Sequence, residues 1–249
     1  MAAEVLLRVI CIVQARTGSS RLPGKVLKPL AGRPMLAHLI ERLQAARSLH
    51  GIVIATTEHE RDLPIVELAG RAGVGCFRGD EDDVLSRYVG AAEAAGADVV
   101  VRITSDCPLI DPVTVDNVVR YFLDHEYDYV AAGVGSGFPR GLDTEVCSRR
   151  ALLEAHRLGR GKPDREHVTY FIHHHPEMFK LGYYLAPPEL HHPEWRLCVD
   201  EEDDFRLIDL IYRRLYRPGE IIDIRRVVEL LENEPELVQI NAHVRQKIV

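Results

Sequence analysis

The chain has 249 residues, 46% of them hydrophobic and 28% charged, and a formal net charge of −7, which argues against the broad basic surface that nucleic-acid binding requires. Its five cysteines form no C-x-x-C pair, and their odd number argues against a disulfide framework. No stretch reaches the roughly 18 apolar residues of a membrane span, and Arg8 interrupts the first apolar run where a signal peptide would have none, so we expect a cytoplasmic protein.

In the first half of the chain, short apolar runs alternate with amphipathic segments. Continuous β-branched runs predict buried strands at 8–14, 51–56 and 98–104. Apolar residues at helical spacing predict helices at 34–47, 61–72 and 83–95. A further helix is predicted to begin at Pro112, with Asp111 as its N-cap. This alternation predicts an α/β fold with a doubly wound, mostly parallel, Rossmann-like sheet.

The pattern changes after about residue 130. The Gly-rich stretch "GVGSGFPRGLD" lacks a helical stripe, and we predict that 135–195 is a small inserted segment of a single domain spanning 1–249. The run "EWRLCVD" (194–200) is predicted to return to the main sheet, and apolar spacing then predicts a helix over 205–215 and a last one at 225–233.

The stretch "QARTGSSRLPGKVLKPL" (14–30) directly follows the first predicted strand. It superficially resembles the P-loop signature G-x-x-x-x-G-K-[ST]. Five residues rather than four separate Gly18 from Gly24, and Val26 follows Lys25 where the P-loop has a hydroxyl residue. The stretch is therefore not a P-loop of that kind.

Three cations nevertheless lie on this turn, at Arg16, Arg21 and Lys25. Ligands of doubly wound sheets bind beyond the carboxyl ends of the strands, which is where this loop begins. Gly18 and Gly24 permit close backbone approach, and the cations can reach phosphate oxygens. The pattern favours a triphosphate-binding loop, the alternative being a surface turn with solvated cations.

Two aspartates follow other predicted strands, Asp106 in "RITSDCPLID" and Asp200 in "RLCVDEEDDF". Mg²⁺ prefers oxygen ligands and typically takes one or two carboxylates besides substrate phosphates. Carboxylates at two strand ends would converge on the cationic loop, as in metal clamping of a nucleotide. The alternatives are that Asp106 stabilises a turn and that Asp200 caps the following helix in a capping box with Asp203.

Two polar stretches are candidates for holding a second substrate. Arginine stands beside acids in "FPRGLDTEV" (138–146) and "DREH" (164–167), where an anionic or hydroxylated acceptor could bind. The acceptor candidates are Arg140, Asp143, Glu145, Arg165 and Glu166. The clustered histidines, among them His167 and His173 to His175, lack a metal-ligand spacing and are interpreted as neutral surface.

The opening loop resembles the start of the cytidylyltransferases that activate acidic sugars, whose signature is approximately A-R-x-x-S-x-R-[LI]-P-G-K. "FRGDEDDVLSRY", "VRITSDCPLIDP", "PRGLDTEV" and "REHVTYFI" resemble the SpsF-like, spore-coat polysaccharide branch of that family. The resemblance extends to about residue 216. It implies a Rossmann-like fold, a homodimer formed through the inserted segment, and transfer of CMP from CTP to an acidic sugar with release of pyrophosphate.

The resemblance also implies roles for individual residues. Arg16, Arg21 and Lys25 match the family's triphosphate-binding cations, on a loop that includes Gly18, Ser19 and Gly24. Asp106 and Asp200 match its two magnesium-binding aspartates, and Arg16 and Lys25 join them as catalytic candidates. Thr56 and Thr57 are placed near the nucleobase. The motif around Asp200 reads "VDEEDD" and lacks the family's usual Thr-Pro.

Two other functions stay open on the sequence alone. A glycosyltransferase with a nucleotide-sugar donor usually carries a D-x-D metal motif, and "DED" (80–82) fits that pattern. A nucleotide-binding subunit without turnover is the second alternative. The intact cation trio and both aspartates favour the nucleotidyltransferase.

Overall fold

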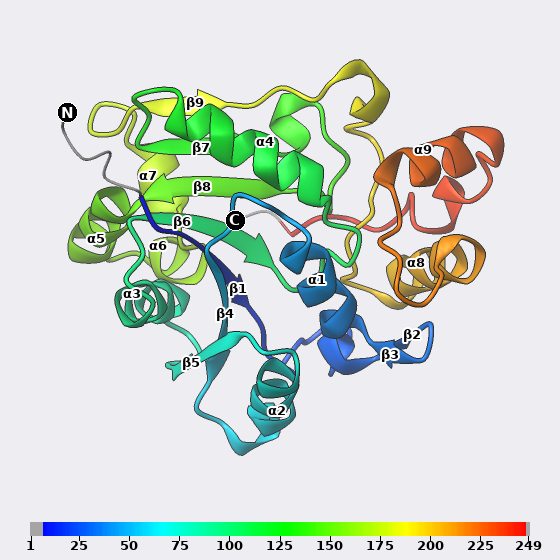
Figure 1. Cartoon of the computed structure of the whole chain (residues 1–249), viewed down its shortest axis with the longest axis horizontal. Helices are drawn as coiled ribbons and strands as arrows, with labels where there is room; N and C mark the ends of the chain where they lie inside the picture. The colour runs from blue at the N-terminus through cyan, green and yellow to red at the C-terminus, as the bar shows by residue number, and fades with distance from the viewer. Residues whose placement is uncertain (1–6, 248–249) are drawn as a thin grey trace.

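The computed structural model describes residues 7–247, and the first six residues of the N-terminal run, on which the signal-peptide expectation partly rests, lie outside this range. A seven-stranded sheet runs through the molecule in the order β5-β4-β1-β6-β8-β7-β9 (Figure 1). Its strands are β1 Val9–Gln14, β4 Gly51–Thr57, β5 Gly75–Gly79, β6 Val99–Thr104, β7 Tyr129–Ala132, β8 Thr144–Ser148 and β9 Leu181–Tyr183. A small hairpin adds β2 Pro29–Leu30 and β3 Arg33–Pro34. The three strands predicted from apolar runs correspond to β1, β4 and β6.

Most of the sheet is parallel, as the strand–helix alternation predicts. β1 pairs in parallel with β4 and β6, and β4 with β5. β8 is antiparallel to both β6 and β7, while β7 and β9 are parallel. The start of β8 therefore lies at the same edge of the sheet as the ends of β1 and β6, which brings loops from both halves of the chain together.

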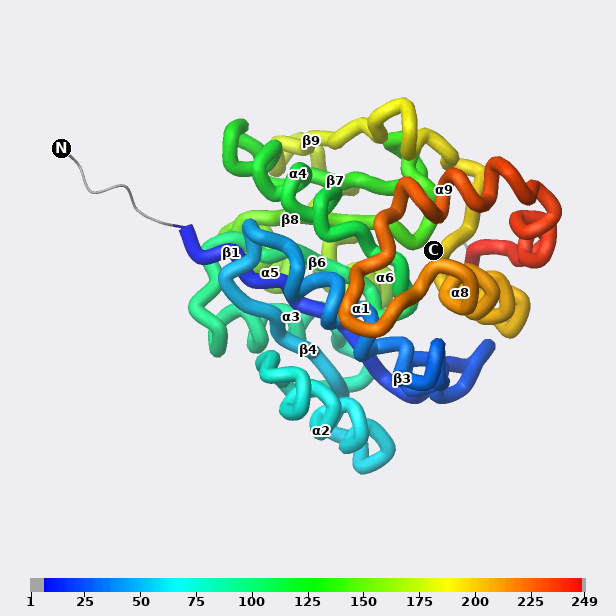
Figure 2. The backbone as a smooth tube through the Cα atoms, turned by 45° about the vertical axis from the view of Figure 1, so that its right-hand side comes forward, coloured from blue at the N-terminus to red at the C-terminus, as the bar shows by residue number. Residues whose placement is uncertain are grey.

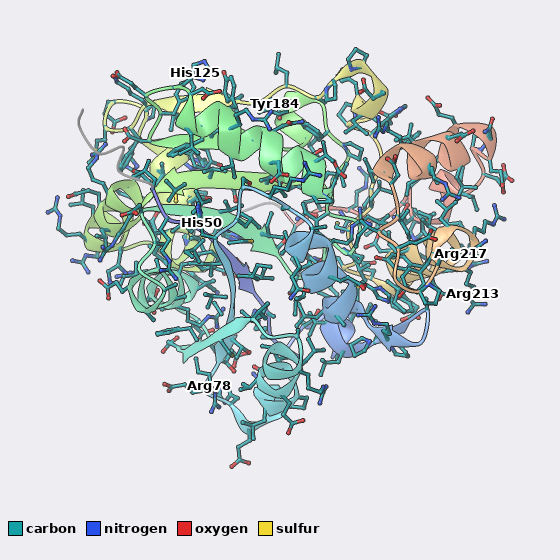
Figure 3. The ribbon with its side chains drawn as sticks, in the orientation of Figure 1. His50, Arg78, His125, Tyr184, Arg213 and Arg217 are labelled. Atoms are coloured by element: carbon teal, nitrogen blue, oxygen red, sulfur yellow. The ribbon has the colours of Figure 1, made fainter. Side chains whose placement is uncertain are left out.

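Helices cover both faces of the sheet (Figures 1 and 2). They are α1 Met35–Gln44, α2 Leu63–Arg71, α3 Val84–Ala94, α4 Pro112–Leu123, α5 Arg149–Leu158, α6 Lys162–Glu166, α7 Tyr170–His174, α8 Glu202–Leu215 and α9 Ile224–Asn233. Asp111 caps α4 by accepting a hydrogen bond from the Thr114 amide at 2.8 Å, as predicted. Arg213 and Arg217 project outward near the end of α8 (Figure 3), where cations complement the helix dipole.

Alternation along the strands separates two hydrophobic cores. Ile10 and Ile12 of β1 pack into a core with α3, α5 and α7, whereas Cys11 and Val13 pack into the core that contains α1, α2, α4, α8 and α9. All five cysteines are free, in agreement with the sequence-based expectation. Between residues 7 and 247, no helix has the length and apolar character to cross a membrane.

The prediction that 194–200 returns to the main sheet is wrong. Within this segment the structure has only an isolated bridge between Arg196 and Arg140. The Leu197 amide donates to the Arg140 carbonyl at 2.6 Å, and the Val199 amide donates to the Asp106 carbonyl at 2.8 Å. The apolar run is buried because it crosses the loops at the edge of the sheet, and burial alone does not distinguish this from a strand. Residues 135–195, predicted to form an inserted segment, supply β8 and β9 to the sheet.

Candidate active site

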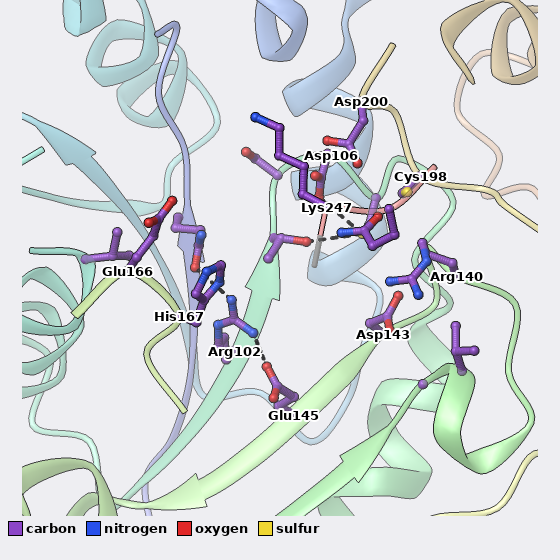
Figure 4. Close-up of a pocket in the computed structure, with 18 of the residues that line it drawn as sticks. Arg102, Asp106, Arg140, Asp143, Glu145, Glu166, His167, Cys198, Asp200 and Lys247 are labelled. Atoms are coloured by element: carbon purple, nitrogen blue, oxygen red, sulfur yellow. Dashed lines mark hydrogen bonds and ion pairs between the residues drawn. The ribbon is translucent and has the colours of Figure 1, made fainter. Parts of the chain in front are cut away.

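A cavity of about 910 Å³ opens at the carboxyl ends of β1 and β6. Its walls come from the loop after β1, the turn after β6, the start of β8, α6 and α7, the end of segment 194–200 and the last described residues. This is the edge at which ligands bind in doubly wound sheets, and the volume lies in the range of small-molecule sites. Figure 4 shows 18 of the residues that line this cavity.

Two distant segments converge on the ammonium group of Lys25. Its Nζ lies 3.2 Å from Asp106 Oδ2 and 2.9 Å from Asp200 Oδ1, and it donates to the Val199 carbonyl at 2.7 Å. Arg21 also contacts Asp200 Oδ1, at 2.8 Å. The structure thus brings together both candidate aspartates and two of the three loop cations.

The charges at this point stabilise one another. Burial alone would lower the pKa of Lys25, but Asp106 and Asp200 outweigh it and raise that pKa above its ordinary value. Burial would raise the pKa of Asp106, yet the charge of Lys25 and hydrogen bonds from Thr104, Lys25 and Cys107 hold it below its ordinary value. Asp106 is therefore a carboxylate at neutral pH, the form that binds cations.

The two aspartates fit a divalent cation that is also held by a nucleotide. Since both carboxylates lie about 3 Å from one ammonium group, they face a common point that a cation can occupy. Within residues 7–247, no cluster of three or more His, Cys, Asp or Glu side chains could hold a metal. Two carboxylates without a third ligand are the arrangement that suits Mg²⁺ completed by phosphates and water.

The alternative role of Asp200 as a helix cap is wrong. Asp204 instead accepts hydrogen bonds from the amides of Asp200 and Glu201, at 2.9 and 3.1 Å, at the start of α8. The second oxygen of Asp200 binds Arg196 Nη2 at 2.6 Å. The Asp200 side chain is therefore committed to cations at the cavity.

The buried carboxylate of Asp62 anchors the loop after β1. Asp62 Oδ1 accepts hydrogen bonds from the amide and the hydroxyl of Thr17, at 2.8 and 2.6 Å, and the Thr57 hydroxyl donates to its other oxygen. The Gly24 amide donates to the Thr17 carbonyl at 2.9 Å. Gly24 has φ +68°, a conformation that favours glycine. These contacts set the shape of the loop.

The remaining nucleotide-binding candidates have different surroundings. Arg16 lines the cavity and pairs with Glu81 at 3.3 Å. The Ser19 hydroxyl accepts from the Leu22 amide at 3.3 Å, within the loop. A Cβ at Gly18 would lie 2.9 Å from Glu81 Oε1, so the glycine permits the Arg16–Glu81 approach.

Thr56 and Thr57 are fully buried and do not line the cavity. Thr57 contributes to the loop through Asp62. The structure thus separates these two residues from the cations and aspartates that it brings together.

At the other end of the cavity, Glu145 belongs to a closed polar cluster. It pairs with Arg102 on the adjacent strand β6 and accepts hydrogen bonds from the hydroxyls of Tyr129 and Thr169. The Arg102 and Glu145 side chains are only 15% and 16% exposed. The pair forms part of the cavity lining and leaves little of its charge for a ligand.

The other acceptor candidates are divided. Arg140, Asp143 and Glu166 line the cavity, whereas Arg165 does not and instead contacts His156 Nδ1 at 2.8 Å. Burial raises the pKa of Asp143; a hydrogen bond from Gly141 and the charge of Arg140 oppose the shift, and the neighbouring carboxylates of Glu145 and Asp106 reinforce it.

Arg102, which lines the cavity, and Arg196, which does not line it but binds Asp200, were not predicted as site residues. Each stands alone in an apolar run, "VVVRIT" and "WRLCV", and this was the available signal, because a lone cation in a buried segment needs a partner. The interpretation of the histidines as surface is wrong for His167 and His173, which line the cavity. Burial lowers the pKa of both imidazoles.

The "DED" stretch (80–82) forms a hydrogen-bonded turn. Asp80 Oδ1 accepts from the amides of Asp82 and Asp83, at 2.8 Å each, and thereby forms the turn before α3. Neither Asp80 nor Asp82 lines the cavity. The D-x-D signal of the glycosyltransferase alternative therefore has no counterpart in the site.

A doubly wound sheet with a cationic loop after its first strand, facing two carboxylates at the same edge, defines a nucleotidyltransferase. The family model described as cytidylyltransferase matches residues 10–244, and the chain belongs to this family.

Three relatives cover almost the whole chain. It is 41% identical over 244 residues to an uncharacterized protein, MJ1063, of Methanocaldococcus jannaschii, and the alignment covers 97% of each chain. It is 32% identical over 235 residues to the spore coat polysaccharide biosynthesis protein SpsF of Bacillus subtilis, which covers 92% of this chain and 95% of the relative. A solved cytidylyltransferase from Leptospira borgpetersenii superposes with a TM-score of 0.87 at 29% identity, covering 98% and 100% of the two chains. The names of the Bacillus subtilis and Leptospira borgpetersenii proteins agree with the branch and the family that the sequence motifs indicate.

Proposed function

We propose that this enzyme is a magnesium-dependent cytidylyltransferase that transfers CMP from CTP to an acidic sugar and releases pyrophosphate. The observation that carries the proposal is the position of Lys25 between Asp106 and Asp200. A cation of the triphosphate loop and two carboxylates for a metal meet there at one point. Membership of the cytidylyltransferase family supports CTP as the donor.

In this proposal, positioning and electrostatics supply most of the rate acceleration. Arg16, Arg21 and Lys25 bind the phosphate oxygens and orient the α-phosphorus toward the acceptor. Asp106 and Asp200 hold Mg²⁺, which neutralises charge on the phosphates when it is bound. The three loop cations exchange their present carboxylate partners for phosphate as the nucleotide enters.

The acceptor occupies the part of the cavity between Asp143 and Glu166. Arg140 and Lys162 offer positive charge to an acidic group there, and polar side chains offer hydrogen bonds to hydroxyls. The name of the Bacillus subtilis relative supports a sugar. Asp143 lines this part of the cavity, and we assign to it the role of accepting the proton of the attacking hydroxyl; its raised pKa makes it the stronger base. With an active acceptor in hand, Asp143→Asn should abolish the acid limb of the pH–rate profile, and an unchanged limb would exclude this role.

A cytoplasmic location, a single domain with an inserted segment at 135–195, and a homodimer formed through that segment stay predictions. Size-exclusion chromatography with light scattering tests the dimer directly.

The test of function begins with the donor. Calorimetry compares CTP, UTP, GTP and ATP, each with and without Mg²⁺, and we expect magnesium-dependent selectivity for CTP. A panel of sugar acids is then screened for pyrophosphate release with CTP. Selective binding of another triphosphate would overturn CTP as the donor. Binding of a nucleotide-sugar with no triphosphate binding would favour the glycosyltransferase.

A further inference from the structure

The last described part of the chain, segment 241–247, folds back over the cavity. In Figure 1 the chain runs from α9 back toward the end of β6. Two side chains attach the segment. Asn241 is buried, and its Nδ2 donates to the Arg196 carbonyl at 2.9 Å and to Asp204 Oδ1 at 2.8 Å. Gln246 Oε1 accepts from Arg196 Nη1 at 2.9 Å. The path of the segment is therefore set at both ends.

One guanidinium group joins this segment to the candidate metal site. Arg196 binds Asp200 through Nη2 at 2.6 Å and Asp204 through Nε at 2.9 Å, and it holds Gln246 through Nη1. Its side chain is only 9% exposed. Because a guanidinium is planar and rigid, the positions of Asp200 and Gln246 are coupled through it.

Lys247 follows this attachment directly and lines the cavity together with Gln246. Figure 4 shows Lys247 beside Asp106 and Asp200, on the side of the cavity away from Glu145. Arg16, Arg21 and Lys25 are all engaged by carboxylates in this structure. A further cation at this end therefore adds to the positive charge that a triphosphate meets.

We propose that segment 241–247 completes the triphosphate site, with Lys247 binding the β- and γ-phosphates and with Arg196 and Gln246 as positioning residues. This inference rests on the proposed use of a nucleoside triphosphate. The outer phosphates are assigned to Lys247 because it lies at the aspartate end, where the loop cations would hold the triphosphate. An acceptor group would lie toward Arg140, Glu145 and Glu166.

The test compares ligands that differ only in phosphate number. Calorimetry with Mg²⁺ measures CTP, CDP and CMP binding to wild type and Lys247→Ala. We expect the variant to bind CTP about tenfold more weakly, the effect of losing roughly one charge-assisted hydrogen bond. The loss should be smaller for CDP and absent for CMP. Lys247→Arg should restore most of the CTP affinity, and Gln246→Ala should show a weaker form of the same phosphate dependence.

Arg245→Ala is the matched control, because Arg245 lies in the same segment, is exposed like Lys247 and carries the same charge but does not line the cavity. It should leave CTP affinity unchanged. Equal CTP binding by wild type and Lys247→Ala, or an equal loss for CTP and CMP, would overturn the inference while leaving the proposed function intact. Absence of CTP binding in the wild type would overturn both.

Discussion

At the aspartate end of the cavity, Lys25 lies between Asp106 and Asp200 and forms an ion pair with each of them. Asp200 also binds Arg21 and Arg196. At the other end, Arg102 and Glu145 pair across two adjacent strands, and two hydroxyls complete the coordination of the carboxylate. Both ends contain buried charge. At the aspartate end the charged residues come from three separate segments, whereas at the Arg102 end the charged pair lies on two paired strands of the sheet.

The two ends therefore differ in whether a ligand can replace the present partners of their charged groups. The Asp106 side chain is 23% exposed and opens into the cavity, so a metal and phosphates can replace its present partner. Arg102 and Glu145 satisfy each other, and removing either would leave an uncompensated buried charge. Substitutions at the first end should therefore change ligand binding, and those at the second should change stability.

The largest effect is expected for Asp106→Asn. The amide keeps the size of the side chain but removes the charge that a metal requires. We expect pyrophosphate release to fall by on the order of 10²–10³-fold, comparable to the loss of one preorganised electrostatic group at a reaction centre. Magnesium should also cease to strengthen CTP binding, as measured by calorimetry. Asp209→Asn, which breaks a pair with Arg213 on α8, is the control. Unchanged magnesium dependence in Asp106→Asn would contradict the metal role.

Glu145→Ala should destabilise the fold. It leaves Arg102 without its carboxylate partner, and breaking a buried pair in this way costs about 3 kcal/mol. Urea unfolding followed by circular dichroism measures the change. The pair between Lys28 and Glu202 is a surface control, since Glu202 is 68% exposed, and Glu202→Ala should cost less than about 1 kcal/mol. Equal costs for the two variants would refute the contrast between the two ends.

The Thr17 anchor should have an intermediate effect. Asp62→Asn weakens the hydrogen bonds that Thr17 and Thr57 make to a charged carboxylate, and we expect a loss of about 2 kcal/mol at pH 7 together with weaker CTP binding. Burial would raise the pKa of Asp62, but these hydrogen bonds hold it below the ordinary 3.8.

The sign of the pH dependence follows from that lowered pKa. The stabilisation is present above pH 3.8 and is lost as the pH falls through the lower pKa of the folded state. The stability difference between wild type and Asp62→Asn should therefore shrink below about pH 4, as followed by urea unfolding at a series of pH values. A difference that stays constant to lower pH would show that the charge of Asp62 is not responsible.

The aspartate end was the more predictable of the two. Asp106 follows a strand that the apolar run "DVVVRIT" identifies, and parallel strand ends meet at one edge of a sheet. The pairing of Arg102 with Glu145 requires knowing that β8 runs antiparallel beside β6, which local periodicity does not encode. The three contacts of Arg196 likewise depend on the path of segment 194–200, whose apolar residues resemble a strand although they form none.

The smallest effect is expected at the edge of the phosphate loop, for Glu81→Gln. Glu81 pairs with Arg16, which is 38% exposed, and also with His59 and Arg61. Removing its charge frees Arg16 for phosphate, so CTP binding should become about two- to threefold tighter, the scale of an exposed ion pair. Glu60→Gln, a nearby exposed acid, should leave affinity nearly unchanged. High salt should erase the gain because it screens exposed charges. Weaker binding in Glu81→Gln would instead mean that Glu81 holds Arg16 in the position that binds phosphate. The Arg16–Glu81 pair would then be a structural pair like that of Arg102 and Glu145, not one that the nucleotide breaks.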